Sequence, residues 1–139
     1  MAVFFKFQQF VEDLGLGVHN LDTGSLKVYL SNATPSASLD AVKADLAEIT
    51  PGNGYTSGGH DATGVWTETA GTATLAGTDI TITASGGTVG PFRYAVLYND
   101  TPTSPADPLI GCWDYGSAIT LNSGEALLVD FGASILTLA

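Results

Sequence analysis

The residues able to act as nucleophiles or metal ligands are few and widely spaced along the chain. Cys112 is the only cysteine among 139 residues, which excludes an intrachain disulfide and a zinc site built from several cysteines. A catalytic thiol needs a nearby histidine, and the sequence places neither His19 nor His60 beside Cys112. We therefore predict that Cys112 is a small buried residue in a strand and that His19, next to Asn20, is a hydrogen-bonded structural residue.

The acidic residues form no pattern that is diagnostic of catalysis. His60 and Asp61 could ligate a metal together with a distant carboxylate such as Asp100 or Asp114, but this dipeptide has no diagnostic spacing. The glycine-rich stretch 54–64 around it lacks the lysine of a phosphate-binding loop and is predicted to be a surface loop. Carboxylate pairs are expected by chance among fourteen acids, and the nearest examples are Glu12 with Asp13 and Asp100 with Asp114. The sequence predicts a protein that is not an enzyme and has no cofactor or metal.

The charge balance limits the classes of partner. The four basic residues are Lys6, Lys27, Lys43 and Arg93, and with fourteen acidic residues they give a formal net charge of -10. Phosphate backbones and anionic lipids are bound by clustered Lys and Arg, so we expect neither nucleic acid nor membrane as a partner. The acidic surface is predicted to be solvated, although acidic pairs could bind Ca²⁺. Only 13% of the residues are charged, which favours surfaces that neighbours cover.

The length of 139 residues predicts a single domain over 1–139. No stretch approaches the roughly 18 consecutive apolar residues of a membrane span. The first ten residues, MAVFFKFQQF, lack the pattern of a secretory signal. We therefore expect a soluble protein made in the cytoplasm.

Residues 92–115 are predicted to be the centre of the fold. From Phe92 to Asn99 the side chains alternate, with Phe92, Tyr94, Val96 and Tyr98 on one face, which is the period of a strand. A proline-containing loop follows, and residues 109–115 predict a second strand. The two runs are rich in aromatic residues, which bury the most area each, so this hairpin is the expected core.

Further short alternating runs, separated by turn residues, predict an all-β fold. In residues 26–30 we expect Leu26, Val28 and Leu30 to point inward and Tyr29 outward. About eight strands at regular spacing favour an antiparallel β-sandwich or jelly roll. The other predicted strands cover residues 64–69, 72–75, 79–84, a short run around 119–121, 125–131 and 135–138.

Two short helices are expected early in the chain. Apolar residues at spacings of three and four predict a helix over 4–14, within a helical arm of residues 1–17. Phe5 lies partly off the apolar stripe, so a strand at the very start is the alternative. The stripe either covers the open end of the β core or docks on a neighbouring subunit. Residues 31–38 read as a loop, and a second helix is predicted over 40–49, with Val42, Leu46 and Ile49 on one side.

Several segments together resemble a known class of proteins. They are KFQQFVEDLGLGVHNL at 6–21, LKVYLSNATP at 26–35, ITPGNGYTSGG at 49–59, ITITASGGTVGPFRYAVLYND at 80–100 and IGCWDYGSAITLNSGEALLVDF at 110–131. The chain is similar in these segments to small structural proteins encoded beside the capsid gene of tailed bacteriophages. The resemblance implies a capsid decoration, or cement, protein that binds the outside of the virion at the junctions between capsomers.

The resemblance implies the major capsid protein and further copies of this chain, in a homo-oligomer, as partners. It carries over no catalytic residue, because the matched motifs are glycine turns and core aromatics. We expect the contacts to come from the N-terminal phenylalanines and from the loops 31–38 and 101–108. The candidate contact residues are Phe4, Phe5, Phe7, Phe10, Pro35, Pro102 and Pro105.

A tail or fibre module that binds host glycans is the alternative hypothesis, since β-sandwiches often bind sugars through their loops. Tyr55, Trp66 and Tyr115 would then form an exposed platform that stacks on sugar rings.

Overall fold

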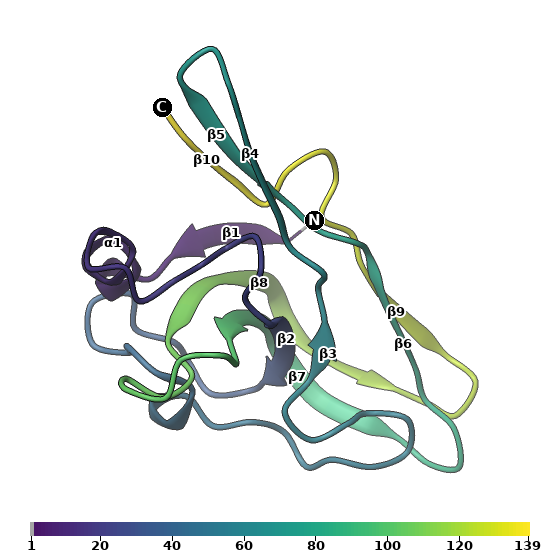
Figure 1. The fold of residues 1–139 in the computed structure, drawn as a ribbon. Helices are drawn as coiled ribbons and strands as arrows, with labels where there is room; N and C mark the ends of the chain where they lie inside the picture. Colours follow the sequence, from purple (N-terminus) through teal and green to yellow (C-terminus); the bar gives the residue numbers. More distant parts are fainter. Residues whose placement is uncertain (1) are drawn as a thin grey trace.

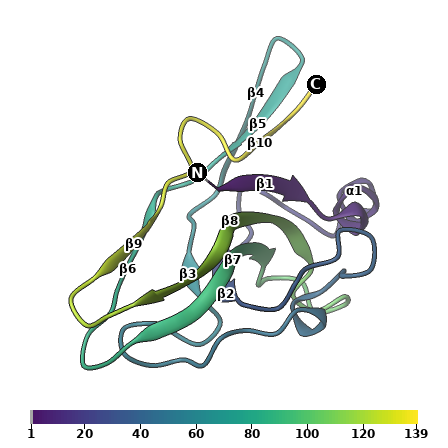
Figure 2. The ribbon, with the colours of Figure 1, turned by 180° about the vertical axis from the view of Figure 1, so that it is seen from behind.

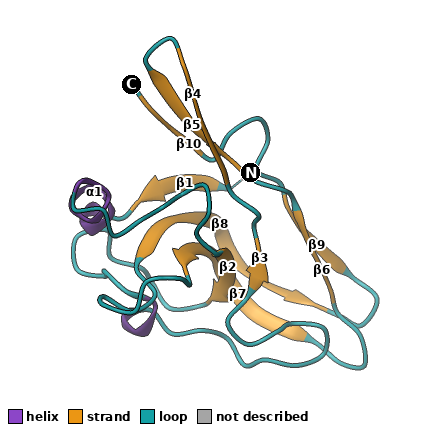
Figure 3. Ribbon diagram, viewed as in Figure 1, coloured by secondary structure: helices purple, strands orange, loops and turns teal. Residues whose placement is uncertain are grey.

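Antiparallel strands are the main regular secondary structure of the computed structural model, which describes residues 2–139 (Figures 1 and 3). A five-stranded sheet has the order β1-β8-β7-β2-β3. Its strands are β1 (Val3–Lys6), β8 (Leu109–Leu121), β7 (Val89–Asn99), β2 (Leu26–Ser31) and β3 (His60–Asp61). The hairpin predicted over 92–115 is confirmed as its centre, because β7 and β8 pair with each other and each has a further strand on its other side.

Two smaller sheets complete the strand content. One has the order β10-β5-β4, with β10 (Leu136–Leu138), β5 (Thr72–Ala76) and β4 (Val65–Thr69). The other pairs β6 (Ile80–Thr83) with β9 (Ala126–Val129). The β4–β5 hairpin and β10 extend away from the five-stranded sheet in both ribbon views (Figures 1 and 2). All pairings in the three sheets are antiparallel, so the all-β prediction is confirmed.

Both faces of the five-stranded sheet are buried. A large core on one face includes Val28, Leu30, Ala95 and Leu97 together with residues of the two smaller sheets. A smaller core on the other face consists of Phe7, Tyr29, Leu46, Tyr94, Val96, Tyr98, Leu109 and Cys112. The outward position predicted for Tyr29 is therefore wrong. Alternation separates the two faces of a strand, but it cannot show that a distant loop, here the one carrying Leu46, covers the second face.

An irregularity in the β7–β8 pairing changes the face of one aromatic residue. Phe92 pairs with Ile119, whereas Tyr94 already pairs with Asp114, so β8 has extra residues between these points. Phe92 packs in the large core with Ala95, while Tyr94 lies in the smaller core. The prediction that both share a face is wrong because the pairing is irregular between these two residues and interrupts the regular alternation.

The N-terminal segment begins as a strand rather than a helix. β1 pairs with β8 through four residues, and α1 spans Gln8–Gly15. The helix predicted over 4–14 is therefore wrong at its start, and the alternative of an initial strand is confirmed. The predicted helical arm of residues 1–17 is likewise not found over residues 2–17, the part of it that the structure describes. The backbone N–H of Phe7 donates to Ile110 O at 3.1 Å, which holds the segment against the sheet. Strand pairing outweighs the local helical spacing here.

The second predicted helix, over 40–49, is reduced to a 3₁₀ turn at Lys43–Asp45. The Asp45 carboxylate accepts from the N–H groups of Ala41 and Val42 at 2.9 and 3.0 Å. Leu46 then enters the smaller core and Ile49 the large core. A single helical face could not reach both cores, so the chain extends after the turn. No helix in residues 2–139 is long and apolar enough to cross a membrane.

Candidate contact surfaces and a buried polar network

The residues that could act as nucleophiles or metal ligands do not gather at one site. Cys112 is buried in β8, as predicted, and burial raises the pKa of its thiol to about 12. Asp100 forms an ion pair with Lys27 at 3.1 Å, and Asp114 forms a two-pronged pair with Arg93 at 2.8 and 3.1 Å. Within residues 2–139, no three His, Cys, Asp or Glu side chains gather where they could hold a metal ion.

Each histidine lies in its own polar surroundings. His19 is buried and its Nδ1 contacts Asn99 Nδ2 at 3.2 Å, so its predicted structural role is confirmed. His60 is half-buried beside the ring of Tyr55, with 5.8 Å between ring centroids. Burial lowers the pKa of His60, and the neighbouring charge of Asp61 opposes that shift. Within residues 2–139, no hydrogen bond joins either histidine to a hydroxyl or thiol group that it could activate.

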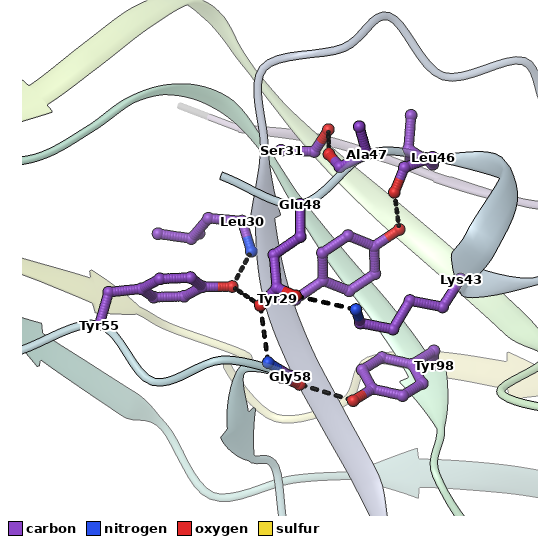
Figure 4. Close-up of polar contacts among 10 residues, drawn as sticks. All are labelled: Tyr29, Leu30, Ser31, Lys43, Leu46, Ala47, Glu48, Tyr55, Gly58 and Tyr98. Atoms are coloured by element: carbon purple, nitrogen blue, oxygen red, sulfur yellow. Dashed lines mark hydrogen bonds and ion pairs between the residues drawn. The ribbon is translucent and has the colours of Figure 1, made fainter. Parts of the chain in front are cut away.

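Glu48 is the centre of a polar network that the sequence did not indicate (Figure 4). Its Oε1 accepts from the Tyr55 hydroxyl and from Gly58 N–H, each at 2.7 Å. Its Oε2 lies 2.9 Å from Lys43 Nζ. Burial alone would raise the pKa of Glu48, but the three donors outweigh it and hold the pKa below its usual value. With every donor directed at it, this carboxylate is placed to anchor the loop 43–58.

Three tyrosines extend the network to the sheet. The Tyr55 hydroxyl accepts from Leu30 N–H of β2 at 3.0 Å. Tyr29 donates to Leu46 O at 2.9 Å, and Tyr98 donates to Gly58 O at 2.6 Å. Lys43 Nζ lies 4.9 Å from the centre of the Tyr29 ring, a cation–π contact. The network therefore joins β2 and β7 to the loop that covers the smaller core (Figure 4). No single element of the sequence signals it, because its members are distributed over residues 29–98.

The N-terminal candidate residues separate into two environments. Phe7 and Phe10 have exposed fractions of 0% and 3% and are buried in this chain's own cores, so Phe7 offers no surface to a partner and Phe10 offers almost none. Phe4 and Phe5 are half-buried. The expected contact surface is therefore corrected for Phe7 and Phe10, which the spacing alone could not distinguish from exposed residues.

An apolar groove of about 490 Å³ lies between β1, α1 and β10. Val11 and Leu138 on its sides have exposed fractions of 55% and 52%. It joins the two ends of the chain, so the sequence offered no signal for it. The groove is lined by Phe4, Phe5, Lys6, Phe10, Val11, Leu14, Leu136, Thr137 and Leu138.

The proline candidates lie outside this groove. Pro35 and Pro102 are half-buried and Pro105 is exposed. The loop with Pro35 is tied to the start of α1 by a hydrogen bond from Gln8 N to Ala37 O at 2.8 Å. The loop of Pro102 and Pro105 is tied to the 3₁₀ turn by a bond from Lys43 N to Asp107 O at 2.9 Å. Both loops are thus held in place by backbone contacts.

A second groove, of about 400 Å³, carries aromatic side chains. Trp113 and Tyr115 of β8 line it together with the exposed Asp130. Trp113 packs between Phe4 and Phe131, with ring centroids 5.0 and 5.5 Å away. Of the aromatic platform expected for glycan binding, Tyr55 is 2% exposed and belongs to the Glu48 network, so the platform of Tyr55, Trp66 and Tyr115 is not formed.

The fold and these surfaces define an all-β protein with antiparallel sheets and two open grooves. Comparison of the chain with protein-family models, with curated proteins and with solved structures finds no match. The surfaces and the sequence motifs therefore carry the functional argument.

Proposed function

We propose that this protein is a non-enzymatic structural component of a phage particle, which decorates and stabilises the icosahedral capsid from outside at capsomer junctions. The observation that carries the proposal is the apolar groove between β1, α1 and β10, which leaves Val11 and Leu138 more than half exposed. Exposed apolar surface of this kind is typical of a protein–protein contact. The major capsid protein is the proposed partner, together with further copies of this chain.

Composition supports the same proposal. A decoration protein is present in many copies, so weak contacts add up through multivalency and favour the assembled shell. The net charge of -10 would keep the decorated particles apart in solution. Phe4 and Phe5 from the N-terminal segment, and Pro35, Pro102 and Pro105 from the two tethered loops, remain proposed contact residues.

A β-sandwich is the architecture we propose for the three sheets. The large core contains Leu97 of the five-stranded sheet, Leu75 of the three-stranded sheet and Ile82 of the two-stranded sheet. Residues of both smaller sheets thus share a core with one face of the larger sheet, and this shared core supports the proposed sandwich.

The test is a cryo-EM reconstruction of purified particles that carry the wild type or the variants Val11→Asp and Leu138→Asp. A carboxylate in an apolar contact should lower the affinity by roughly tenfold or more. We expect wild-type density on the shell and reduced occupancy for both variants. Val65→Asp, at a 48% exposed position on β4 outside the groove, is the matched control.

Thermal unfolding of each variant separates a lost contact from a lost fold. Full occupancy of both folded groove variants would reject the groove as the contact. Wild-type density confined to the tail or neck would reject the decoration role.

A glycan-binding tail module is the second candidate, and the aromatic groove of Trp113, Tyr115 and Asp130 favours it. Aromatic rings stack on sugars, and a carboxylate accepts from sugar hydroxyls. Chemical shifts of residues around Tyr115 should move when host glycans are added, and Tyr115→Ala should abolish the change while Trp66→Ala keeps it. Unmoved shifts, or an equal loss in both variants, would reject this site.

A further inference from the structure

Three polar side chains are buried on α1, on the turn that follows it and at the end of β7. Asp13 of α1 is 4% exposed, His19 is 8% exposed and Asn99 of β7 is 1% exposed. Phe10 of α1 packs on the His19 ring, with 5.2 Å between centroids. Buried polar groups of this kind require hydrogen-bond partners, so their arrangement can be derived from the available donors and acceptors.

The protonation of His19 follows from the orientation of Asn99. Asn99 Oδ1 accepts from Thr101 N–H at 3.1 Å, so the amide Nδ2 is the atom that faces His19 Nδ1, at 3.2 Å. An amide nitrogen only donates, so Nδ1 of His19 must accept. The neutral ring therefore carries its proton on Nε2.

In this tautomer two buried groups lack a hydrogen-bond partner, one of them a donor and the other an acceptor. Nε2 of His19, a donor in this tautomer, and Oδ2 of Asp13, an acceptor, both lack a partner among residues 2–139. The other oxygen of Asp13 is held by Gln9 Nε2 at 3.0 Å, and Asp13 O accepts from Val18 N–H at 3.0 Å. Asp13 is also the charge that acts on His19.

We propose that neutral His19 is a pH-sensitive latch, which links Asn99 of β7 through Nδ1 to the Asp13 carboxylate of α1 through Nε2–H and one bridging water. A proton taken from solvent onto Nδ1 removes the acceptor of the Asn99 amide. Turning that amide would restore the contact with His19 but break the one with Thr101. Protonation thus weakens the attachment of α1 to the sheet.

The direction with pH follows from the burial of the ring. Burial lowers the pKa of His19 below 6.5, and the smaller effect of the Asp13 charge opposes it. The unfolded chain therefore binds the proton more readily than the folded one. The contribution of the latch is complete above pH 6.5 and is lost as the pH falls from 6.5 toward the lower folded pKa.

The remaining charged groups near His19 are exposed or paired. Glu12 on α1 and Asp22 in the following turn are exposed, and Asp100 at the end of β7 is paired with Lys27. Because α1 supplies Phe10, Val11 and Leu14 to the apolar groove, opening of the latch loosens one wall of that groove. The latch does not depend on what the groove binds.

The tautomer is tested on the wild-type protein by long-range ¹H–¹⁵N NMR of the histidine rings at about pH 7.5, above the ordinary histidine range. We expect a protonated Nε2 and a bare Nδ1 for His19. The opposite tautomer, or a charged ring at this pH, would overturn the proposal without the need for any variant.

The latch itself is tested by hydrogen exchange of α1 amides between about pH 7.5 and 5, corrected for the intrinsic rate. The relevant difference is the one between the pKa of His19 in the open state and its lower pKa in the folded state. Below both values, the equilibrium constant for opening of α1 should be larger by roughly tenfold for each unit of that difference. β7 and β8 should keep their protection. His19→Gln should remove the pH dependence, while His60→Gln, at the other histidine, should keep it. Protection of α1 that is independent of pH in the wild type, or equally dependent in His19→Gln, would overturn the latch.

Discussion

Among single residues, Glu48 connects several parts of the fold, because its carboxylate joins three separate parts of the loop that covers the smaller core. It accepts from Lys43, Tyr55 and Gly58, and Tyr55 in turn accepts from the backbone of β2. Buried polar groups stabilise a fold when all their partners are present and destabilise it when one is removed. The network therefore determines how firmly this loop is held.

Removal of one hydroxyl from this network should be measurable. Tyr55→Phe leaves the buried Leu30 N–H without its acceptor and removes a donor from Glu48, so we expect a loss of about 2–3 kcal/mol in the free energy of unfolding. Urea unfolding measures it. Tyr115→Phe, at a half-buried position outside the network, should change stability by less than about 0.5 kcal/mol. Equal effects of the two variants would show that the network adds no stability.

The lowered pKa of Glu48 gives this residue an acid-dependent contribution. That contribution is complete above its ordinary value of 4.5 and is lost as the pH falls through the lower folded pKa. Glu48→Gln should therefore be less stable than the wild type near pH 7, and the difference should shrink in acid. Thermal midpoints across this range provide the measurement, and a constant difference would contradict the assignment.

At the scale of elements, the attachment of β3 to β2 depends on a close backbone approach. Gly59, just before β3, has φ +88°, and a Cβ there would collide with the carbonyl of Val28 on β2. Backbone atoms cannot move aside as a flexible side chain can. This position therefore requires glycine for space as well as for conformation.

Two alanine substitutions separate these requirements. Gly86 also has a positive φ, +79°, but nothing lies within 4 Å of its added Cβ. Gly86→Ala should cost about 1–2 kcal/mol through conformation alone. Gly59→Ala should lower the free energy of unfolding clearly more than Gly86→Ala does, because β2 or β3 must also shift. Chemical denaturation compares the two, and similar costs would show that the strands yield easily.

The elements that could be predicted from the sequence are those whose signal is local. Alternation located β2 and the β7–β8 hairpin, and turn residues separated the smaller strands. The start of α1 could not be predicted, because Phe4 has helical spacing to Phe7 and yet pairs with Trp113 in a strand. The groove could not be predicted either, since it requires Val11 and Leu138, near opposite ends of the chain, to meet.

For the molecule as a whole, the excess of acidic residues is the dominant electrostatic feature. Three of the four basic side chains are already in ion pairs: Lys27, Lys43 and Arg93. The remaining charge is mostly acidic and exposed, so the folded state repels itself. Low salt is therefore expected to destabilise the fold.

We expect the thermal midpoint to rise by a few degrees between about 20 and 300 mM NaCl, as salt screens this repulsion. A double variant, Glu68→Gln with Asp130→Asn, removes two exposed charges and should respond less. Differential scanning calorimetry measures both proteins. A midpoint that falls with salt would show that the three ion pairs outweigh the general repulsion.

The single cysteine allows opening of the five-stranded sheet to be measured by thiol labelling. Cys112 has no exposed surface, and its raised pKa of about 12 leaves almost no thiolate at neutral pH. A thiol reagent can therefore react only during the moments when β8 separates from its neighbours. As the chain has no other thiol, the labelling rate of the wild-type protein directly measures how often β8 opens.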